Sequence, residues 1–193
     1  MVSTQNQVFM KSKIILLALF LPIVGLVAFK GIEKRIIKRN LLKKEPNGTV
    51  YLIIDKSEYE LQVYDDDGWY ATYPVVFGNK DLSDKLMEGD RKTPEGTFKI
   101  LSKREHEKWH KMFMLDYPNK DSWDKFNQRK SVGMIPKSAK IGGGIAIHGT
   151  WPHDDIVVDG YTNWTNGCIS LKNEDLDELD AILPVGTKVI IRQ

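Results

Sequence analysis

Short runs of β-branched and aromatic residues dominate the middle of the chain. Each run is bounded by a turn signal, as at Pro46-Asn47-Gly48 and at the acidic turn 65–68. Apolar runs of this length, separated by tight turns, are typical of an antiparallel meander. We therefore expect strands over residues 49–55, 60–64, 69–77, 96–100, 145–147 and 187–192.

Two later segments depart from the strand pattern. Residues 173–183 carry leucines at helical spacing, and we expect Asn173 to cap this helix, with acidic residues at the positive end of its dipole. Residues 102–130 are polar, aromatic and weakly helical. So long a stretch inside a β domain is often a functional lid. The predicted class is mostly β, with a C-terminal helix and a lid.

The N-terminal region has a different pattern. Residues 14–29 contain no charge and follow Lys11 and Lys13, as in a signal sequence, but no A-x-A-like cleavage site follows. A helix of that length covers about 24 Å, and lysine snorkelling at both ends extends it toward the roughly 30 Å of a bilayer core. We expect an uncleaved signal anchor over residues 1–30. A cleaved signal peptide is the alternative.

A basic segment, residues 31–47, follows the apolar run, and we expect it to be a juxtamembrane linker. Its lysines and arginines argue against export, because the positive-inside rule retains basic flanks in the cytoplasm. Export is still expected, because the chemistry described below acts outside the membrane. The predicted organisation is an anchor over residues 1–30, a linker over 31–47 and one globular domain over 48–193.

Composition narrows the classes of function. The net charge is +2 and no long basic stripe with interleaved aromatics is present, which argues against a nucleic-acid partner. The chain contains one cysteine, Cys168, so it cannot form an internal disulfide. A lone thiol in an exported protein is either a partner for another chain or a reactive group.

Cys168 and His148 together point to nucleophilic chemistry. Cys168 follows Gly167 in a polar turn, where a substrate carbonyl can approach it. A thiol needs a neighbouring base to ionise, and His148 ends an apolar strand next to Gly149. A lone cysteine is more often a small buried hydrophobe. The placement of both residues beside glycines favours a catalytic pair, and we expect a partly ionised thiol with a lowered pKa.

The motifs around this pair resemble those of the L,D-transpeptidase catalytic domain, also called the YkuD domain. Residues 142–150 (GGGIAIHGT) and 165–171 (TNGCISL) are similar to its His-Gly pair followed by Ser/Thr-x-Gly-Cys. Residues 93–98 (TPEGTF) resemble its Thr-Pro-x-Gly-x-Phe segment. The resemblance covers residues 49–192, and the combination of motifs is more specific than any one of them.

The resemblance implies a β-sandwich fold with peptidoglycan stem peptides as substrates and no metal or organic cofactor. Cys168 would attack the carbonyl of the third stem residue, expel D-Ala and form a thioester. A side-chain amine of a neighbouring stem would resolve it as a cross-link. His148 would be the base and then the acid, oriented by the carbonyl of Gly149. The N–H groups of Asn166, Gly167 and Cys168 would form the oxyanion hole.

The same resemblance implies a location outside the cytoplasmic membrane. We expect the domain to lie in the periplasm or the cell-wall space, anchored through residues 14–29. Two positions depart from the family's usual Ser-His-Gly-Cys-Ile-Arg. Asn166 replaces a histidine, and Ser170 replaces an arginine that can make a bidentate contact. We place Ser170 with Asn166 and Gly167 among the substrate-binding positions.

Two alternatives remain open. Residues 106–110 read HEKWH, a pattern that on a helix holds zinc with glutamate as general base. The segment lacks an apolar face and an evident third ligand, so a solvated lid helix is the simpler interpretation. The second alternative keeps the fold but lets water resolve the thioester, which gives an L,D-carboxypeptidase or an endopeptidase.

Overall fold

The computed structural model describes residues 34–193. The predicted anchor over residues 1–30 therefore lies outside the described residues. Within residues 34–193, no helix has both the length and the apolar character needed to cross a bilayer.

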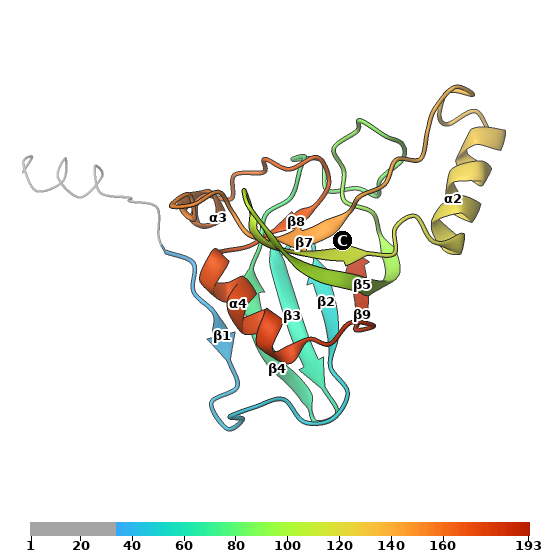
Figure 1. The fold of residues 1–193 in the computed structure, drawn as a ribbon. Helices are drawn as coiled ribbons and strands as arrows, with labels where there is room; N and C mark the ends of the chain where they lie inside the picture. The colour runs from blue at the N-terminus through green and yellow to red at the C-terminus, as the bar shows by residue number, and fades with distance from the viewer. Residues whose placement is uncertain (1–33) are drawn as a thin grey trace, which may run out of the picture. The chain divides into compact units, whose positions relative to one another are not determined.

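One sheet organises this part of the chain (Figure 1). Between residues 34 and 193 it contains nine strands, in the order β1-β4-β3-β2-β9-β5-β6-β7-β8. The strands are β1 (Lys38–Arg39), β2 (Tyr51–Asp55), β3 (Glu60–Asp65), β4 (Gly68–Pro74), β5 (Gly96–His106), β6 (His110–Leu115), β7 (Ala146–His148), β8 (Ile169–Ser170) and β9 (Lys188–Arg192). The helices in this same part of the chain are α2 (Lys120–Ser131), α3 (Ile156–Asp159) and α4 (Asn173–Ile182).

The predicted meander is confirmed. β2, β3 and β4 pair antiparallel in sequence order, and β9 joins β2 in parallel. Alternate residues such as Leu52 and Ile54 in β2 and Leu61 and Val63 in β3 are fully buried, as the period of two requires. Each such side chain contributes about 1.5–3 kcal/mol by leaving water. This packed face forms the core.

The sheet bends so that β8 lies next to the segment that follows β4. β5 pairs with β9 through its first residues and with β6 through its later ones, and its register shifts between Ile100 and Ser102. Such irregularities bend a strand. Beyond the end of β4, Val76 forms an antiparallel bridge with Ser170 of β8. The mostly β class is therefore confirmed.

The expected lid over residues 102–130 is wrong for its first half. Residues up to Leu115 complete the β5–β6 hairpin, in which His106 pairs with His110. Only α2 is helical, and the Asn119 side chain caps it by accepting from Ser122 N at 3.0 Å. The strand pattern was hidden because the outward side chains of β5 are charged, so few apolar positions mark the alternation.

The helix predicted over residues 173–183 is confirmed as α4, but the prediction that Asn173 caps it is wrong. Lys172 occupies the N-cap position without a side-chain cap bond. Asn173 instead accepts a hydrogen bond from Thr150 N at 3.0 Å. Leu176 and Leu179 are fully buried and hold the helix against the core. The carboxamide of Asn173 therefore supports the backbone just after His148.

Residues 34–47 do not form a separate linker. Lys34–Gln193 is one compact unit, and β1 pairs with β4 through Lys38–Thr72 and Arg39–Ala71. The Arg35 guanidinium donates to the carbonyls of Tyr59, Val75 and Val158 at 2.5, 3.2 and 3.1 Å. The five donors of arginine suit such a set of carbonyls. The described domain thus starts before residue 48.

Candidate active site

Two short parallel strands bring the predicted base and nucleophile together. β7 ends at His148, and β8 begins directly after Cys168. The two strands pair in the register Ile147–Ile169 and His148–Ser170. Both isoleucines are fully buried, and neighbouring strands lie about 4.8 Å apart. The core therefore fixes the two segments side by side, although they are far apart in the sequence.

The imidazole of His148 is buried and held in one orientation. It is 2% exposed, and its Nδ1 lies 2.7 Å from the carbonyl oxygen of Gly149. Because a carbonyl can only accept, Nδ1 carries the hydrogen and Nε2 is left unprotonated. Burial lowers the pKa of His148 to about 4, against a smaller raising effect of the Gly149 bond. The ring is neutral at pH 7, as a general base must be.

The thiol of Cys168 is protonated in this environment. The residue is half-buried, and its Sγ donates to the carbonyl of Gly144 at 3.5 Å. Burial raises the pKa of the Cys168 thiol, while a backbone bond from Ala146 and the charge of Lys85 act the other way with smaller effect. The expected resting thiolate with a lowered pKa is therefore wrong. The site pairs a neutral thiol with a neutral imidazole.

The Gly149 peptide is held on both sides. Its N–H donates to Trp109 O at 3.1 Å, and its carbonyl accepts from His148 Nδ1 and from Ser170 Oγ, the latter at 3.2 Å. A Cβ at this position would lie 2.1 Å from Asn173 Oδ1 and 2.9 Å from Trp109 O. Only glycine fits, so the glycine after the histidine has a steric cause.

Ser170 corrects the sequence interpretation. Contrary to the substrate-binding role expected for it, its side chain is fully buried, and its hydroxyl donates to Gly149 O. β8 lies between β7 and Val76, which encloses its residues. Ser170 therefore supports the Gly149 carbonyl from the buried side and does not face a substrate.

The turn before Cys168 is held by Thr165. Its Oγ1 accepts from Gly167 N at 3.1 Å and donates to Cys168 O at 2.8 Å. The N–H of Gly167 therefore already donates to Thr165, and the prediction that it belongs to the oxyanion hole is wrong. Gly167 is needed for its φ of 123° and because a Cβ would lie 2.7 Å from Lys92 O. Asn166 is exposed, and the N–H groups of Asn166 and Cys168 remain as oxyanion candidates.

Two tryptophans that the sequence interpretation missed lie against His148. The ring of Trp109 stacks on the imidazole with centroids 4.9 Å apart, and Trp164 meets it edge-on at 5.4 Å. In the sequence, the feature that could have indicated these contacts is the presence of tryptophan at positions 109, 151 and 164. That signal does not say which ring meets the histidine, because the contact depends on the hairpin pairing.

The HEKWH motif does not form a zinc site. It lies at the tip of the β5–β6 hairpin rather than on a helix, so the two imidazoles do not share a helical face. His110 Nε2 lies 2.8 Å from Asp177 Oδ1, whereas His106 stacks on Trp109 at 4.5 Å. Between residues 34 and 193 no group of three His, Cys, Asp or Glu side chains is arranged to hold a metal ion. The zinc-peptidase alternative is therefore wrong.

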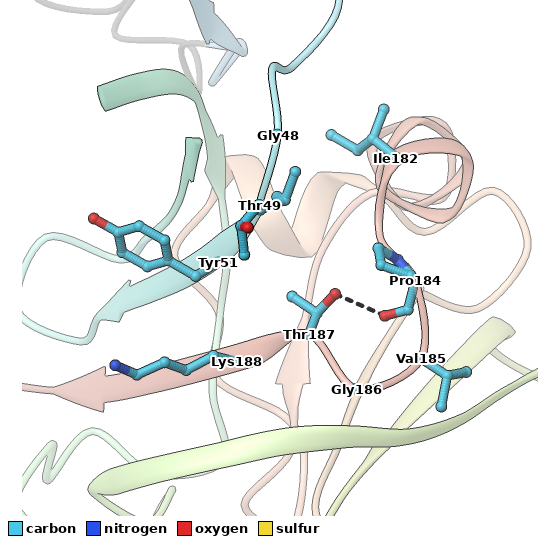
Figure 2. A pocket seen from close by; sticks show the side chains of 10 residues that line it. Gly48, Thr49, Tyr51, Ile182, Pro184, Val185, Gly186, Thr187 and Lys188 are labelled. Atoms are coloured by element: carbon cyan, nitrogen blue, oxygen red, sulfur yellow. Dashed lines mark hydrogen bonds between the residues drawn. The ribbon is translucent and has the colours of Figure 1, made fainter. Parts of the chain in front are cut away.

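A roomy groove elsewhere on the domain carries no comparable chemistry. It has a volume of about 610 Å³ and lies where β2 and β9 begin, next to the end of α4 (Figure 2). Ile182, Pro184 and Val185 give it an apolar wall, and Thr187 Oγ1 donates to Pro184 O at 2.6 Å. Neither Cys168 nor His148 lines it. Reactive groups, rather than cavity size, locate the candidate site.

A family model and a sequence relative each match most of this chain. The family model described as "YkuD: L,D-transpeptidase catalytic domain" matches residues 49–191. The Bacillus subtilis (strain 168) protein named "Putative L,D-transpeptidase YqjB" is 29% identical over 148 residues, which cover 75% of this chain and 72% of that protein.

Solved structures show the same fold. The helical cell shape determining protein Pgp2 from Campylobacter jejuni is 25% identical, with a TM-score of 0.54, and the match covers 75% of this chain and 48% of that one. Bd1075 from Bdellovibrio bacteriovorus is 21% identical, with a TM-score of 0.51 and the same coverage. The chain thus spans about half the length of these solved structures.

Proposed function

The chain belongs to the YkuD L,D-transpeptidase catalytic domain family, whose members act on peptidoglycan peptides, and we propose that it is itself a cysteine-dependent L,D-transpeptidase. One observation carries the proposal. A neutral histidine, with Nδ1 fixed on Gly149 O, ends the strand next to the one that Cys168 precedes. That arrangement supplies a nucleophile and a base on a rigid support.

In the first half of the reaction, His148 Nε2 takes the proton of the Cys168 thiol as Sγ attacks the carbonyl of the third stem residue. The tetrahedral oxyanion is stabilised by the N–H groups of Asn166 and Cys168. The carbon–nitrogen bond to D-Ala then breaks. The leaving amine takes the proton back from His148, which yields free D-Ala and a thioester on Cys168.

In the second half, an amine of a neighbouring stem attacks the thioester carbonyl. His148 Nε2 removes a proton from this amine, and the same proton returns to Sγ as the carbon–sulfur bond breaks. A new amide forms and the thiol is regenerated. In the first half proton transfer accompanies attack, because burial disfavours the charged forms of both His148 and Cys168. No metal or organic cofactor takes part in this proposal.

The decisive experiment is incubation of the full chain with purified muropeptides, followed by mass analysis. A cross-linked dimer with release of D-Ala is expected. Release of D-Ala with only a shortened stem would assign the hydrolytic alternative, in which water replaces the amine. No change of mass in any stem peptide, with the chain folded, would overturn the proposal.

We further propose that residues 14–29 anchor the protein in the cytoplasmic membrane, with the domain in the periplasm or cell-wall space. The support is the uncharged run itself and the extracytoplasmic location of the proposed substrate. A reporter fused after Gln193 tests it. Reporter activity restricted to the cytoplasm would contradict the proposal and agree with the basic flank that follows the run.

A further inference from the structure

The tip of the β5–β6 hairpin lies against the proposed base. The ring of Trp109 stacks on His148 with 27° between the ring planes, and it also stacks on His106 with 7° between them. Aromatic stacking of this kind contributes about 0.5–1.5 kcal/mol beyond area burial. The imidazole therefore has a preferred plane that the turn between β5 and β6 imposes on it.

The same tryptophan also holds the peptide that orients the base. Trp109 O accepts from Gly149 N, while Gly149 O accepts from His148 Nδ1. The ring and the backbone of Trp109 thus act on two parts of one unit. A shift of the hairpin tip would move the imidazole plane and its hydrogen-bond partner together.

The hairpin tip is itself fixed. His106 Nδ1 accepts from the backbone N–H groups of Lys108 and Trp109 at 3.2 and 3.3 Å. His110 has a φ of 59°, an uncommon region for a residue other than glycine. Its bond to Asp177 on α4 holds it in that conformation. The two histidines of the HEKWH motif therefore fix the turn that presents Trp109.

Trp164 encloses the imidazole from another direction. It meets His148 at an interplanar angle of 76° and Trp109 at 60°. Its own backbone is fixed, because Trp164 N donates to Phe77 O at 2.9 Å. With one ring stacked on it and one edge against it, the imidazole is shielded from water, in agreement with its 2% exposure.

We propose that Trp109 is a positioning residue for His148, whose ring fixes the imidazole plane and excludes water so that Nε2 stays unprotonated and held in one orientation. The kinetic part of this proposal rests on the proposed function, whereas its structural part does not. Without the ring, water reaches the imidazole and hydrates its charged form. His106 stacks on Trp109, and its proximity also disfavours a charge on His148.

A titration of the histidine signals by NMR tests the structural part in the full chain. Burial lowers the pKa of His148 to about 4, and we expect the wild-type signal to titrate there. In Trp109→Ala we expect this pKa to rise by more than one unit toward the ordinary value of about 6.5. Trp109→Phe keeps a flat aromatic ring, so most of the lowering of the His148 pKa should remain. Trp123→Ala is the matched control, since Trp123 is 45% exposed on α2 and packs on Phe126.

Acylation kinetics test the functional part. In Trp109→Ala, acylation of Cys168 by a carbapenem is expected to slow by roughly 10- to 100-fold, less than the 10²- to 10⁴-fold of complete base loss. In the pH profile of the acylation rate, the fall on the acid side should move to higher pH in Trp109→Ala. A purely structural role of Trp109 would not cause that shift. An unchanged His148 titration and an unchanged acid side of the pH profile in folded Trp109→Ala would overturn the proposal.

The two proposals fail in different ways. A wild type that is never acylated contradicts the proposed function, while the titration still decides the role of Trp109. If Trp109→Ala does not fold, Trp109→Leu takes its place, because it keeps apolar bulk without a flat ring. We expect Trp109→Leu to raise the pKa of His148 above that in Trp109→Phe, and equal values in the two variants would contradict the proposal.

Discussion

The base and the nucleophile of the proposed site are held by different kinds of structure. His148 ends a buried strand, is 2% exposed and has Trp109 and Trp164 against its ring. Cys168 is half-buried and follows a turn whose residue Asn166 is exposed. His148 is enclosed by packing, whereas Cys168 is only partly buried and is held in place by a turn.

This difference separates two requirements of the chemistry. A base must keep its protonation state and orientation, and burial with a fixed Nδ1 bond provides both. A nucleophile must be reached by a carbonyl, so its support comes from backbone geometry. Thr165 Oγ1 bonds Gly167 N and Cys168 O, and Arg91 Nε donates to Thr165 O at 3.3 Å. We expect the two sides to respond differently to substitution.

The largest effect is expected from the two reactive groups themselves. Cys168→Ser should abolish the mass adduct with a carbapenem, because an alcohol beside one histidine is far harder to ionise than a thiol. His148→Ala should slow adduct formation by roughly 10²- to 10⁴-fold. Intact-protein mass spectrometry measures both, and Trp123→Ala on α2 is the comparison, with a far smaller change. Full labelling of His148→Ala would contradict the assignment of the base.

The enclosed side also predicts a pH dependence of stability. The folded pKa of His148 is about 4, against about 6.5 unfolded. Between these values the unfolded chain binds more protons, so this contribution is present above pH 6.5 and is lost as pH falls toward 4. The loss is about 3 kcal/mol at the limit, at 1.36 kcal/mol per unit. As the pH falls from 6.5 to 4, the free energy of unfolding of the wild type should therefore decrease relative to that of His148→Gln.

Comparison with His148→Gln is needed because a second group acts in the opposite sense. Burial raises the pKa of Asp175 to about 7, so the folded chain holds an extra proton below that pH. Asp175 is present in both proteins and cancels from their difference. Parallel pH profiles for the two proteins would contradict the burial argument for His148.

A smaller effect is expected when the Gly149 peptide is crowded. Gly149→Ala places a Cβ 2.9 Å from the backbone oxygen of Trp109, and overpacking costs about 1–3 kcal/mol. Both the free energy of unfolding and the acylation rate should fall. Gly143→Ala is the matched control, because its nearest neighbour is Pro118 Cδ at 3.8 Å. Equal losses in the two variants would contradict the steric explanation.

Removing one donor from the Gly149 carbonyl should have a weaker effect. Ser170→Ala deletes the bond from Oγ but leaves His148 Nδ1 on the same oxygen. A single neutral hydrogen bond contributes about 0.5–1.5 kcal/mol, so acylation should slow by only a few-fold. Ser170→Thr keeps the hydroxyl and should act faster than Ser170→Ala. A 100-fold loss in Ser170→Ala would instead indicate a direct contact with substrate.

The sequence predicts the parts of this molecule that local patterns determine. The meander strands alternate clearly, because one face is buried and the other is polar, and the glycine-flanked motifs identify Cys168 and His148. The rest depends on pairing between distant segments. Ser170 and Asn173 have buried roles only because β8 lies between β7 and Val76. Likewise, the pKa directions of His148 and Cys168 follow from burial that no motif states.

The smallest effect is expected on the solvent-facing side, at Asn166. Its side chain is exposed, and the proposed role belongs to its backbone N–H. Asn166→Ala should therefore change the acylation rate by less than about twofold, which stopped-flow measurement with a carbapenem can determine. Replacing Asn166 by its α-hydroxy analogue removes the N–H. That change should slow acylation by roughly 10²- to 10³-fold, as loss of one oxyanion donor does. If Asn166→Ala slowed acylation more than the α-hydroxy analogue did, the side chain of Asn166 rather than its N–H would contribute. The N–H of Cys168 would then be the sole proposed oxyanion donor.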